Sequence, residues 1–543
     1  MSTLDPIPAD PIVLNGAELT VADVEAVARG GRSAVLATDA RERVAEARAV
    51  IERLVASGEV VYGVTTGFGS LATTFVPPDQ AQELQERLLL SHAAGVGEPL
   101  PTEVVRAMLL LRANTLALGH SGCRPELIDR LLELLRLGIH PVVPSQGSMG
   151  ASGDLAPLAH LALPVIGHGQ VELDGGVVPA AVALAQTGLE PLVLEPKEGL
   201  ALLNGTQMMS AIGALLLATA DRLAQTASVA AALSVEALRG TEVAFSAAYQ
   251  STRPHPGQVR TAAELRWLLR ESTLQHAHHG DKHRVQDPYS LRCVPQVHGA
   301  VRDALDNLRR VLDIELNSAT DNPLVFPQGA NVPEDALATG RGLVISGGNF
   351  HGEPIALALD YAKLAIAEIG AISERRVALL LDPRLNDGLP AFLGAASGLD
   401  SGLMILQYTA AALASESKTL AHPASADSIP TSANQEDHVS MGSIAARHAR
   451  IVLEHSERII AIELICAAQG LDLRLAMRAD TRLGAGVAEA HMRIRSVIDH
   501  LEHDREPGPD IEAATRLVHG GALVDLARPP RTVGTSWLGL DPR

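Results

Sequence analysis

The chain has 543 residues and a hydrophobic share of 47%, so it is long enough for several domains and can bury a large core. Aromatic residues make up only 2%, so the core is built mostly from alanine, leucine and valine, which suits helix packing better than sheets. With 44 Lys and Arg against 63 Asp and Glu, the net charge is −19 and no basic stretch occurs, which argues against nucleic acid or an anionic membrane as partner. We therefore expect a mainly α fold.

The sequence also argues against a secreted, metal-binding or membrane protein. Cys123, Cys293 and Cys466 are far apart and lack metal-ligand spacing, which fits a reducing compartment. The N-terminal residues show neither the basic region nor the apolar core of a signal peptide. The apolar stretch 208–220 ends at Asp221 and is too short to span a bilayer. We expect a cytoplasmic protein without a metal.

The first half of the chain mixes short helices with Gly and Pro punctuation. A helix is predicted over Asp39–Ser57, with Asp39 and Glu42 as a capping box and Gly58 as its end. One face of this helix carries four apolar residues: Val44, Ala47, Ile51 and Leu54. A more apolar helix is predicted over Arg106–Leu118.

Longer helices are predicted after Gly205. Ile355–Asp382 and Ser443–Gln469 are apolar for most of their turns, so neighbours must cover them, either in a bundle or in other subunits. We predict an N-terminal domain over residues 1–205 and a long-helix bundle over residues 206–543, which ends in a Pro- and Arg-rich surface tail.

The triplet Ala151-Ser152-Gly153 has the most distinctive chemistry in the sequence. It lies among small residues in GSMGASGDLAPLAH, and Gly153 permits backbone angles closed to other residues. The amide of Gly153 could attack the carbonyl of Ala151, and Ser152 could then lose its hydroxyl as water. The product would be a methylidene-imidazolone, an electrophile made from the chain itself. The alternative is an ordinary loop that enters a helix, with Asp154 in the first turn.

Three further loops combine glycine with a polar or aromatic side chain, as sites often do. Tyr62 in YGVTTGFG could be a general base if nearby positive charge lowered its pKa, or a buried tyrosine at a turn. Asn204 could bond a substrate amine or the electrophile, or cap the end of a helix. A short strand that leads into a Gly-rich loop is predicted over 342–350.

Arg292 is a candidate for binding a substrate carboxylate. It follows Tyr289 by three residues in QDPYSLR, and an arginine fork matches a carboxylate, although a surface ion pair is the alternative. The polar loop 431–438 could equally be a solvated connection. The histidine-rich stretch 276–283 lacks the spacing of a zinc site, so we interpret it as a solvated loop. Nothing indicates a dinucleotide, ATP or pyridoxal phosphate.

Taken together, these motifs resemble those of the aromatic amino acid ammonia-lyase family, and most closely its histidine branch. The resemblance extends from roughly Val21 to Ala527. It rests on eight stretches: GSMGASGDLAPLAH, YGVTTGFG, LLLSHAAGVG, KEGLALLNGTQ, VQDPYSLRC, NSATDNPL, SGGNFHGEP and TSANQEDHVSMG.

The resemblance implies an almost wholly helical homotetramer whose sites each draw residues from three subunits. It implies that Ala151, Ser152 and Gly153 cyclise into methylidene-imidazolone, with no external cofactor, and that Tyr62 is the catalytic base. Residues around the electrophile and the substrate carboxylate would be Asn204, Gln286, Tyr289 and Arg292. Phe350 would form an aromatic wall of the site.

Two positions bear on the substrate. Ser91-His92 and Glu436 match the histidine branch, and a carboxylate is a strong acceptor for an imidazole N–H. The resemblance implies that His92 and Glu436 hold the imidazole and that Glu436 is also catalytic, by helping proton transfer. The implied reaction is loss of ammonia from L-histidine to give trans-urocanate. Three residues depart from the usual histidine-branch pattern: Thr65, Val294 and His298. A tyrosine or phenylalanine ammonia-lyase, a 2,3-aminomutase of the same family, and a non-catalytic helical scaffold remain as alternatives.

Overall fold

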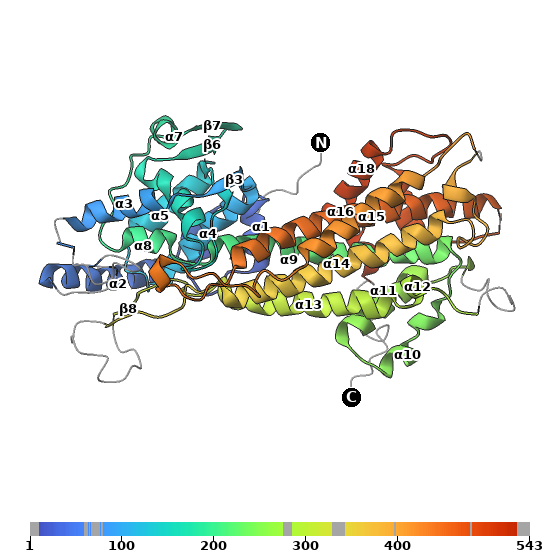
Figure 1. Cartoon of the computed structure of the whole chain (residues 1–543), viewed down its shortest axis with the longest axis horizontal. Helices are drawn as coiled ribbons and strands as arrows, with labels where there is room; N and C mark the ends of the chain where they lie inside the picture. Colours follow the sequence, from blue (N-terminus) through green and yellow to red (C-terminus); the bar gives the residue numbers. More distant parts are fainter. Residues whose placement is uncertain are drawn as a thin grey trace. The chain divides into compact units, whose positions relative to one another are not determined.

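A computed structural model describes residues 10–58, 63, 66, 76–77, 80–274, 285–327, 343–395, 398–477 and 480–528 (Figure 1). Helices dominate these ranges and the strands are short, which confirms the mainly α prediction. The chain forms two compact units that are each discontinuous in sequence. Unit 1 is the chain up to Ala218 with Leu308–Asp360 and Pro423–Arg447, and unit 2 is the remainder. The domain boundary proposed after residue 205 stays a prediction.

Most of the short elements belong to unit 1. Its helices are α1 (Val21–Ala28), α2 (Thr38–Ser57), α3 (Ala81–His92), α4 (Thr102–Ala117), α5 (Pro125–Arg136), α6 (Leu155–Ala162), α7 (Ala180–Thr187) and α8 (Glu198–Leu203). Its strands are β1 (Ile12–Leu14), β2 (Ala34–Leu36), β3 (Val96–Pro99), β4 (His140–Pro141), β5 (Pro144–Gln146), β6 (Gln170–Leu173), β7 (Gly176–Pro179), β8 (Leu324–Phe326) and β9 (Leu343–Ile345).

Four of the five boundaries between the units lie within long helices: α9 (Gln207–Ala237), α13 (Val294–Glu315), α14 (Glu353–Leu381) and α16 (Gly442–Met477). The other helices of unit 2 are α10 (Ala247–Ser251), α11 (Pro256–Leu269), α12 (Tyr289–Arg292), α15 (Met404–Leu420), α17 (Ala485–Arg495) and α18 (Gly508–His519). None of the helices in the described ranges could span a bilayer.

The strands form four small sheets. β1 pairs with β2 in parallel, β3 with β5 antiparallel, and β6 lies between β4 and β7 with both pairings antiparallel. In the fourth sheet, Leu324 pairs with Ile345 and Phe326 with Leu343, antiparallel. This pairing brings the polar turn before β8 close to the Gly-rich loop after β9.

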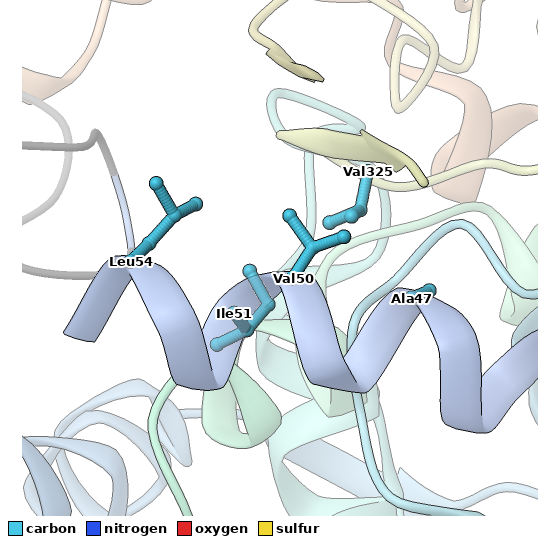
Figure 2. Packing of buried hydrophobic residues seen from close by; sticks show 5 residues of the cluster. All are labelled: Ala47, Val50, Ile51, Leu54 and Val325. Carbon is cyan, nitrogen blue, oxygen red and sulfur yellow. The ribbon is translucent and has the colours of Figure 1, made fainter. Parts of the chain in front are cut away.

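Helix α2 shows how the apolar pattern builds the core of unit 1. The predicted face is buried, and Val50 and Ala47 point toward Val325 of β8 (Figure 2). Gly58 ends the helix in the left-handed conformation, as predicted. The predicted capping box is wrong: Ala37 is the N-cap without a side-chain bond, and Asp39 pairs with Arg43 one turn later.

Both long helices begin before their predicted first residue, and α14 ends at Leu381, one residue before its predicted end. α14 begins at Glu353, before Pro354, because proline fits the first turn of a helix, where its missing N–H costs nothing. α16 continues to Met477. The C-terminal part is folded to residue 528, with α18 and the 3₁₀ turn Val524–Ala527, and the residues beyond, where the tail was expected, lie outside the described ranges.

Charged side chains lie inside the fold, which composition did not predict. Lys197, Lys363, Arg112 and Arg376 are among the largest fully buried side chains. Since a buried charge is costly unless it is paired or hydrogen-bonded, each marks a polar network that the chain has to assemble.

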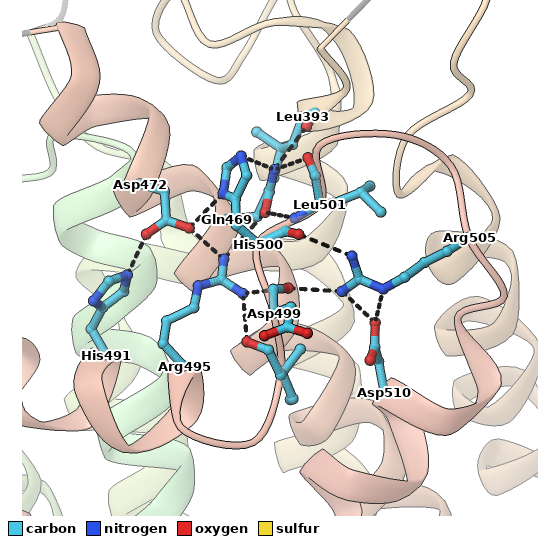
Figure 3. A network of polar contacts seen from close by, with 11 residues as sticks. Leu393, Gln469, Asp472, His491, Arg495, Asp499, His500, Leu501, Arg505 and Asp510 are labelled. Carbon is cyan, nitrogen blue, oxygen red and sulfur yellow. Dashed lines mark hydrogen bonds and ion pairs between the residues drawn. The ribbon is translucent and has the colours of Figure 1, made fainter.

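One such network joins three segments of unit 2 (Figure 3). Asp472 on α16 accepts hydrogen bonds from His491 Nε2 on α17 at 2.6 Å and from His500 Nδ1 at 2.7 Å. Arg495 lies 2.7 Å from the same carboxylate and also donates to the carbonyl oxygen of Asp499. A single carboxylate therefore holds α17 and the loop after it against α16.

Candidate active site

The triplet lies in a tight turn that only glycine can close. Gly150 and Gly153 form an isolated antiparallel β-bridge, and their φ angles are positive, 70° and 73° respectively. Gly153 also bridges Gly205, and a Cβ built on Gly153 would overlap the Gly205 carbonyl. The N–H of Asp154 donates to that same carbonyl at 2.6 Å. The backbone of the triplet is thus pressed against the segment between α8 and α9.

Asn204 is the partner of the triplet's hydroxyl. Ser152 Oγ donates to Asn204 Oδ1 at 2.5 Å. Asn204 is the C-cap of α8, as one interpretation of the sequence proposed, and its backbone oxygen accepts from Arg112 Nη1 at 2.8 Å. The capping role and a role at the triplet are therefore compatible.

Asp154 links the triplet to the first turn of α9. Its side chain makes no cap for α6, the helix that it precedes. Instead, Oδ2 accepts the N–H groups of Met208 and Met209 at 3.0 Å each, in the first turn of α9. Burial raises the pKa of Asp154 to about 7. The first-turn role predicted for Asp154 is thus performed at α9 rather than at α6.

The segment before α16 backs the triplet loop from another direction. Met441 N–H donates to the carbonyl oxygen of Met149 at 2.8 Å, and Ser440 Oγ donates to that of Gly150 at 3.3 Å. A Cβ on Gly150 would overlap Ser440 Oγ, and one on Gly352 would lie 2.8 Å from it. Ser440 therefore fits between two glycines. Sequence reasoning missed it, although it lies in the motif TSANQEDHVSMG.

Glu436 is held in a strained loop just before this segment. Thr431 and Glu436 exchange two backbone hydrogen bonds, and Thr431 Oγ1 donates to Glu436 Oε2 at 3.0 Å. Between them, Ser432, Ala433 and Asn434 have φ values of 50°, 53° and 67°. Such backbone strain persists only where the surroundings enforce it and concentrates at functional sites.

Phe350 follows β9 and precedes α14, at the end of the predicted strand and Gly-rich loop. It is half-buried. The next residue, His351, stacks on His438 with ring centroids 5.9 Å apart, and its Nε2 lies 3.2 Å from the His438 carbonyl oxygen. Asn322 Oδ1 accepts the Gly347 N–H at 2.7 Å, which fixes the start of the loop. Phe350 and Glu436 thus belong to two loops that touch through these histidines.

His92 is the last residue of α3. Its Nδ1 lies 2.9 Å from the Leu88 carbonyl oxygen and 3.1 Å from Ser91 Oγ. Within the described residues, the hydrogen-bonding contacts of His92 are with its own helix, and none of them joins it to the triplet or to Glu436.

Gln286, Tyr289 and Arg292 form a separate cluster in unit 2. Arg292 Nη2 donates to Gln286 Oε1 at 3.0 Å and Nε to the Asp287 carbonyl oxygen at 3.0 Å. Its guanidinium lies 4.6 Å from the centre of the Tyr289 ring, which is 72% exposed. The arrangement leaves a positively charged fork beside an accessible aromatic ring.

The remaining predicted positions divide into two groups. Tyr62, Thr65 and the histidine-rich stretch 276–283 lie outside the described residues. Val294 and His298, two of the departures from the pattern, are fully buried on α13. Within the described residues, no cluster of three or more histidine, cysteine, aspartate or glutamate side chains could hold a metal.

The chain is similar to known lyases over nearly its full length. Residues 19–496 match the family described as aromatic amino acid lyase. The chain is 52% identical to histidine ammonia-lyase of Symbiobacterium thermophilum over 509 residues, 94% of this chain and 97% of that protein. Its fold is similar to the crystal structure of histidine ammonia-lyase from Trypanosoma cruzi, with a TM-score of 0.86, 43% identity, and coverage of 98% and 99%. It is also similar to tyrosine aminomutase from Streptomyces globisporus, with a TM-score of 0.88, 39% identity, and coverage of 95% and 98%.

Proposed function

The chain belongs to the aromatic amino acid lyase family, and from that premise we propose that it eliminates ammonia from L-histidine to give trans-urocanate. The observation that carries this proposal is the intact triplet in its tight turn, with the Ser152 hydroxyl on Asn204. The 52% identity to a histidine ammonia-lyase supports the choice of substrate.

The electrophile proposed is methylidene-imidazolone, formed from the triplet itself. Closure makes a bond from the Gly153 nitrogen to the Ala151 carbonyl carbon. That carbonyl oxygen leaves as water, with one proton from each of the Gly153 and Ser152 nitrogens. The Ser152 hydroxyl and the Ser152 Cα proton then leave together as a second water, and a Cα=Cβ double bond remains. Since a Cβ at position 153 would overlap Gly205, only glycine permits the turn that this closure needs.

Once formed, this ring supplies an electrophile that turns the substrate's amino group into a leaving group. Tyr62 is proposed to take the β-proton, a step in which a general base typically contributes about 10²–10⁴-fold. Arg292 is proposed to hold the substrate carboxylate, because its planar fork matches a carboxylate geometrically. Tyr289 and Gln286 would complete that end of the site, since both are grouped with Arg292.

The other end of the site is proposed to recognise the imidazole. Glu436 supplies an acceptor for an imidazole N–H, His92 a second polar partner, and Phe350 an aromatic wall. The strained loop that holds Glu436 supports this role, because the strain fixes where its carboxylate lies.

We further propose a cytoplasmic homotetramer with sites shared between subunits. Large side chains remain exposed along α14 and α15, among them Tyr361 at 49% and Tyr408 at 64%, which favours cover by other subunits. The three cysteines are unpaired, as expected in a reducing compartment.

A second candidate is an aminomutase or ammonia-lyase acting on tyrosine or phenylalanine, favoured by the TM-score of 0.88 to a tyrosine aminomutase. The experiment that separates the two incubates the purified full chain with L-histidine, L-tyrosine or L-phenylalanine singly and identifies each product. Urocanate and ammonia from histidine support the proposal. A β-amino acid, or faster turnover of tyrosine or phenylalanine, overturns the histidine assignment. Absence of turnover with all three would favour the non-catalytic scaffold.

A further inference from the structure

A fully buried ion pair, Lys197 with Asp321, contacts the side chain of Asn204 through Asp321. Lys197 Nζ donates to Asp321 Oδ2 at 3.0 Å, and both side chains are 0% exposed. Lys197 has φ of 76°, a left-handed conformation that is unfavourable for a lysine, at the N-cap of α8. The backbone is therefore strained at the residue whose side chain reaches inward to Asp321, which indicates that the position of this ammonium group matters.

Asp321 determines which way the Asn204 amide faces. Asn204 Nδ2 donates to Asp321 Oδ1 at 3.2 Å and to the Asn322 carbonyl oxygen at 3.0 Å. An ionised carboxylate and a backbone carbonyl only accept hydrogen bonds, so the NH₂ group has to face them. Turning the amide over would set Oδ1 against two acceptors. The Asn204 oxygen must therefore face Ser152, whose hydroxyl donates to it at 2.5 Å.

Asp321 is itself fixed by its two other partners. Its Oδ1 also accepts the N–H of Asn322 at 2.6 Å, and its Oδ2 faces Lys197. The four side chains form one continuous chain of contacts from Lys197 through Asp321 and Asn204 to Ser152. All four lie in unit 1.

We propose that Asp321, held by Lys197, is a positioning residue for maturation of the triplet, an inference that rests on the proposed function. Through Asn204 it holds the Ser152 hydroxyl as a donor, which leaves the lone pairs of Oγ available for the proton that converts the departing hydroxyl into water. The proton comes from the Ser152 Cα, and the electron pair of that C–H bond becomes the Cα=Cβ double bond as the C–O bond breaks. Neither Asp321 nor Lys197 touches the substrate in this role.

A matched pair of double variants separates amide orientation from folding. Lys197→Met/Asp321→Asn and Lys197→Met/Asp321→Leu both remove the ion pair, so neither leaves one buried charge without the other. The Asn substitution keeps an oxygen that can accept from Asn204, whereas Leu has a similar size and no acceptor. Each full-length variant is purified as folded protein. At intervals after synthesis it is digested, and the mass of the peptide that spans Ser152 is measured by mass spectrometry.

We expect the wild-type peptide and the Asp321→Asn double variant to lose two waters. The Asp321→Leu double variant should lose the second water about tenfold more slowly, the ratio for a barrier higher by roughly 1.4 kcal/mol. As a control, Glu264→Gln changes the carboxylate of another buried pair, with Arg302 at 2.5 Å in unit 2, and should leave the peptide mass of the wild type.

Equal rates of dehydration in the two double variants would overturn the inference. If the Leu variant does not fold, the single variant Asp321→Asn decides, because its new amide cannot present oxygen to both Lys197 and Asn204. Slow dehydration there supports the inference, and the wild-type rate overturns it. A wild-type protein that forms urocanate while Ser152 keeps its full mass would instead overturn the proposed electrophile.

Discussion

The hydroxyl of Ser443 donates to the carbonyl oxygen of Ser148 at 2.5 Å. This bond ties the first turn of α16 to the loop that leads into the triplet. Glu436 lies a few residues before the same turn, so the segment proposed to recognise the substrate side chain also supports the electrophile. A change in this segment is therefore expected to affect both specificity and maturation.

The first prediction concerns Ser152→Ala. The half-buried side chain loses one hydrogen bond, typically about 1 kcal/mol, so the protein should fold and keep nearly all of its thermal stability. It should lose nearly all activity, and its triplet peptide should not lose the second water, because in the wild type that water contains the Ser152 oxygen. Mass spectrometry and a urocanate assay check this, with Ser496→Ala as a control at a surface hydroxyl. Turnover by Ser152→Ala at a rate close to that of the wild type would exclude the proposed electrophile.

Arg292→Lys should raise the KM for histidine. Lysine keeps the charge but not the planar fork, and losing a charged hydrogen bond of about 1.5–3 kcal/mol corresponds to roughly tenfold to hundredfold. Histidinamide, which lacks the carboxylate, should gain relative to histidine. Steady-state kinetics on both substrates measure the effect. The control is Arg493→Lys, which removes the two parallel hydrogen bonds from a guanidinium to Asp525 and should leave the KM for histidine unchanged. An unchanged KM would show that another group binds the carboxylate.

Glu436→Gln should reduce kcat/KM for histidine by about a hundredfold or more, since it removes a charged acceptor from the imidazole. A site built around hydrogen bonds rejects an analogue that lacks them by about 10⁴–10⁵, so wild-type protein should turn over L-phenylalanine very poorly. Asp437→Asn changes the next residue, which is exposed, and should have little effect. Phenylalanine turnover that equals histidine turnover would contradict this prediction.

Asp472→Asn should destabilise unit 2 in a pH-dependent way. Burial acts to raise the pKa of Asp472, but bonds from His491 and His500 and the charge of Arg495 lower it from 3.8 to about 2. A lowered folded-state pKa stabilises the fold above pH 3.8, and this contribution is lost as the pH falls toward 2.

Thermal unfolding followed by circular dichroism should therefore show that Asp472→Asn has a free energy of unfolding roughly 2 kcal/mol lower than that of the wild type at pH 7. This difference should shrink below pH 4. Asp382→Asn, at a carboxylate paired with the exposed Arg384, should change little because surface ion pairs contribute little. A difference between Asp472→Asn and wild type that did not vary with pH would contradict the assignment.

The sequence predicted those parts of the fold that depend on local pattern. The apolar faces of α2, α14 and α16 recur at helical spacing, so these helices were found with errors mainly at their ends. The capping box of α2 failed because Asp39 pairs with Arg43 instead. Cap geometry depends on the backbone just before the helix, which residue type alone does not determine.

The site was predicted only as a set of separate loops. Glycine next to polar side chains indicated the loops of the triplet, Asn204 and Phe350, but spacing alone did not show that Ser152 meets Asn204, 52 residues later. The pair Lys197–Asp321 is separated by 124 residues and consists of residue types that are usually exposed. Only the assembled fold shows that both are buried.

Two of the contacts that hold the triplet loop come from residues late in the chain. Ser440 and Ser443 contact carbonyl groups that lie 290 and 295 residues earlier. Residues 151–153 are synthesised long before α16, so the contacts from Ser440 and Ser443 are still missing at that stage. On the proposed chemistry, the nascent chain therefore still carries an unmodified serine at position 152. If cyclisation needs these contacts, the chain is made as an inactive precursor that needs no protease, and the triplet matures only after most of the chain has been synthesised.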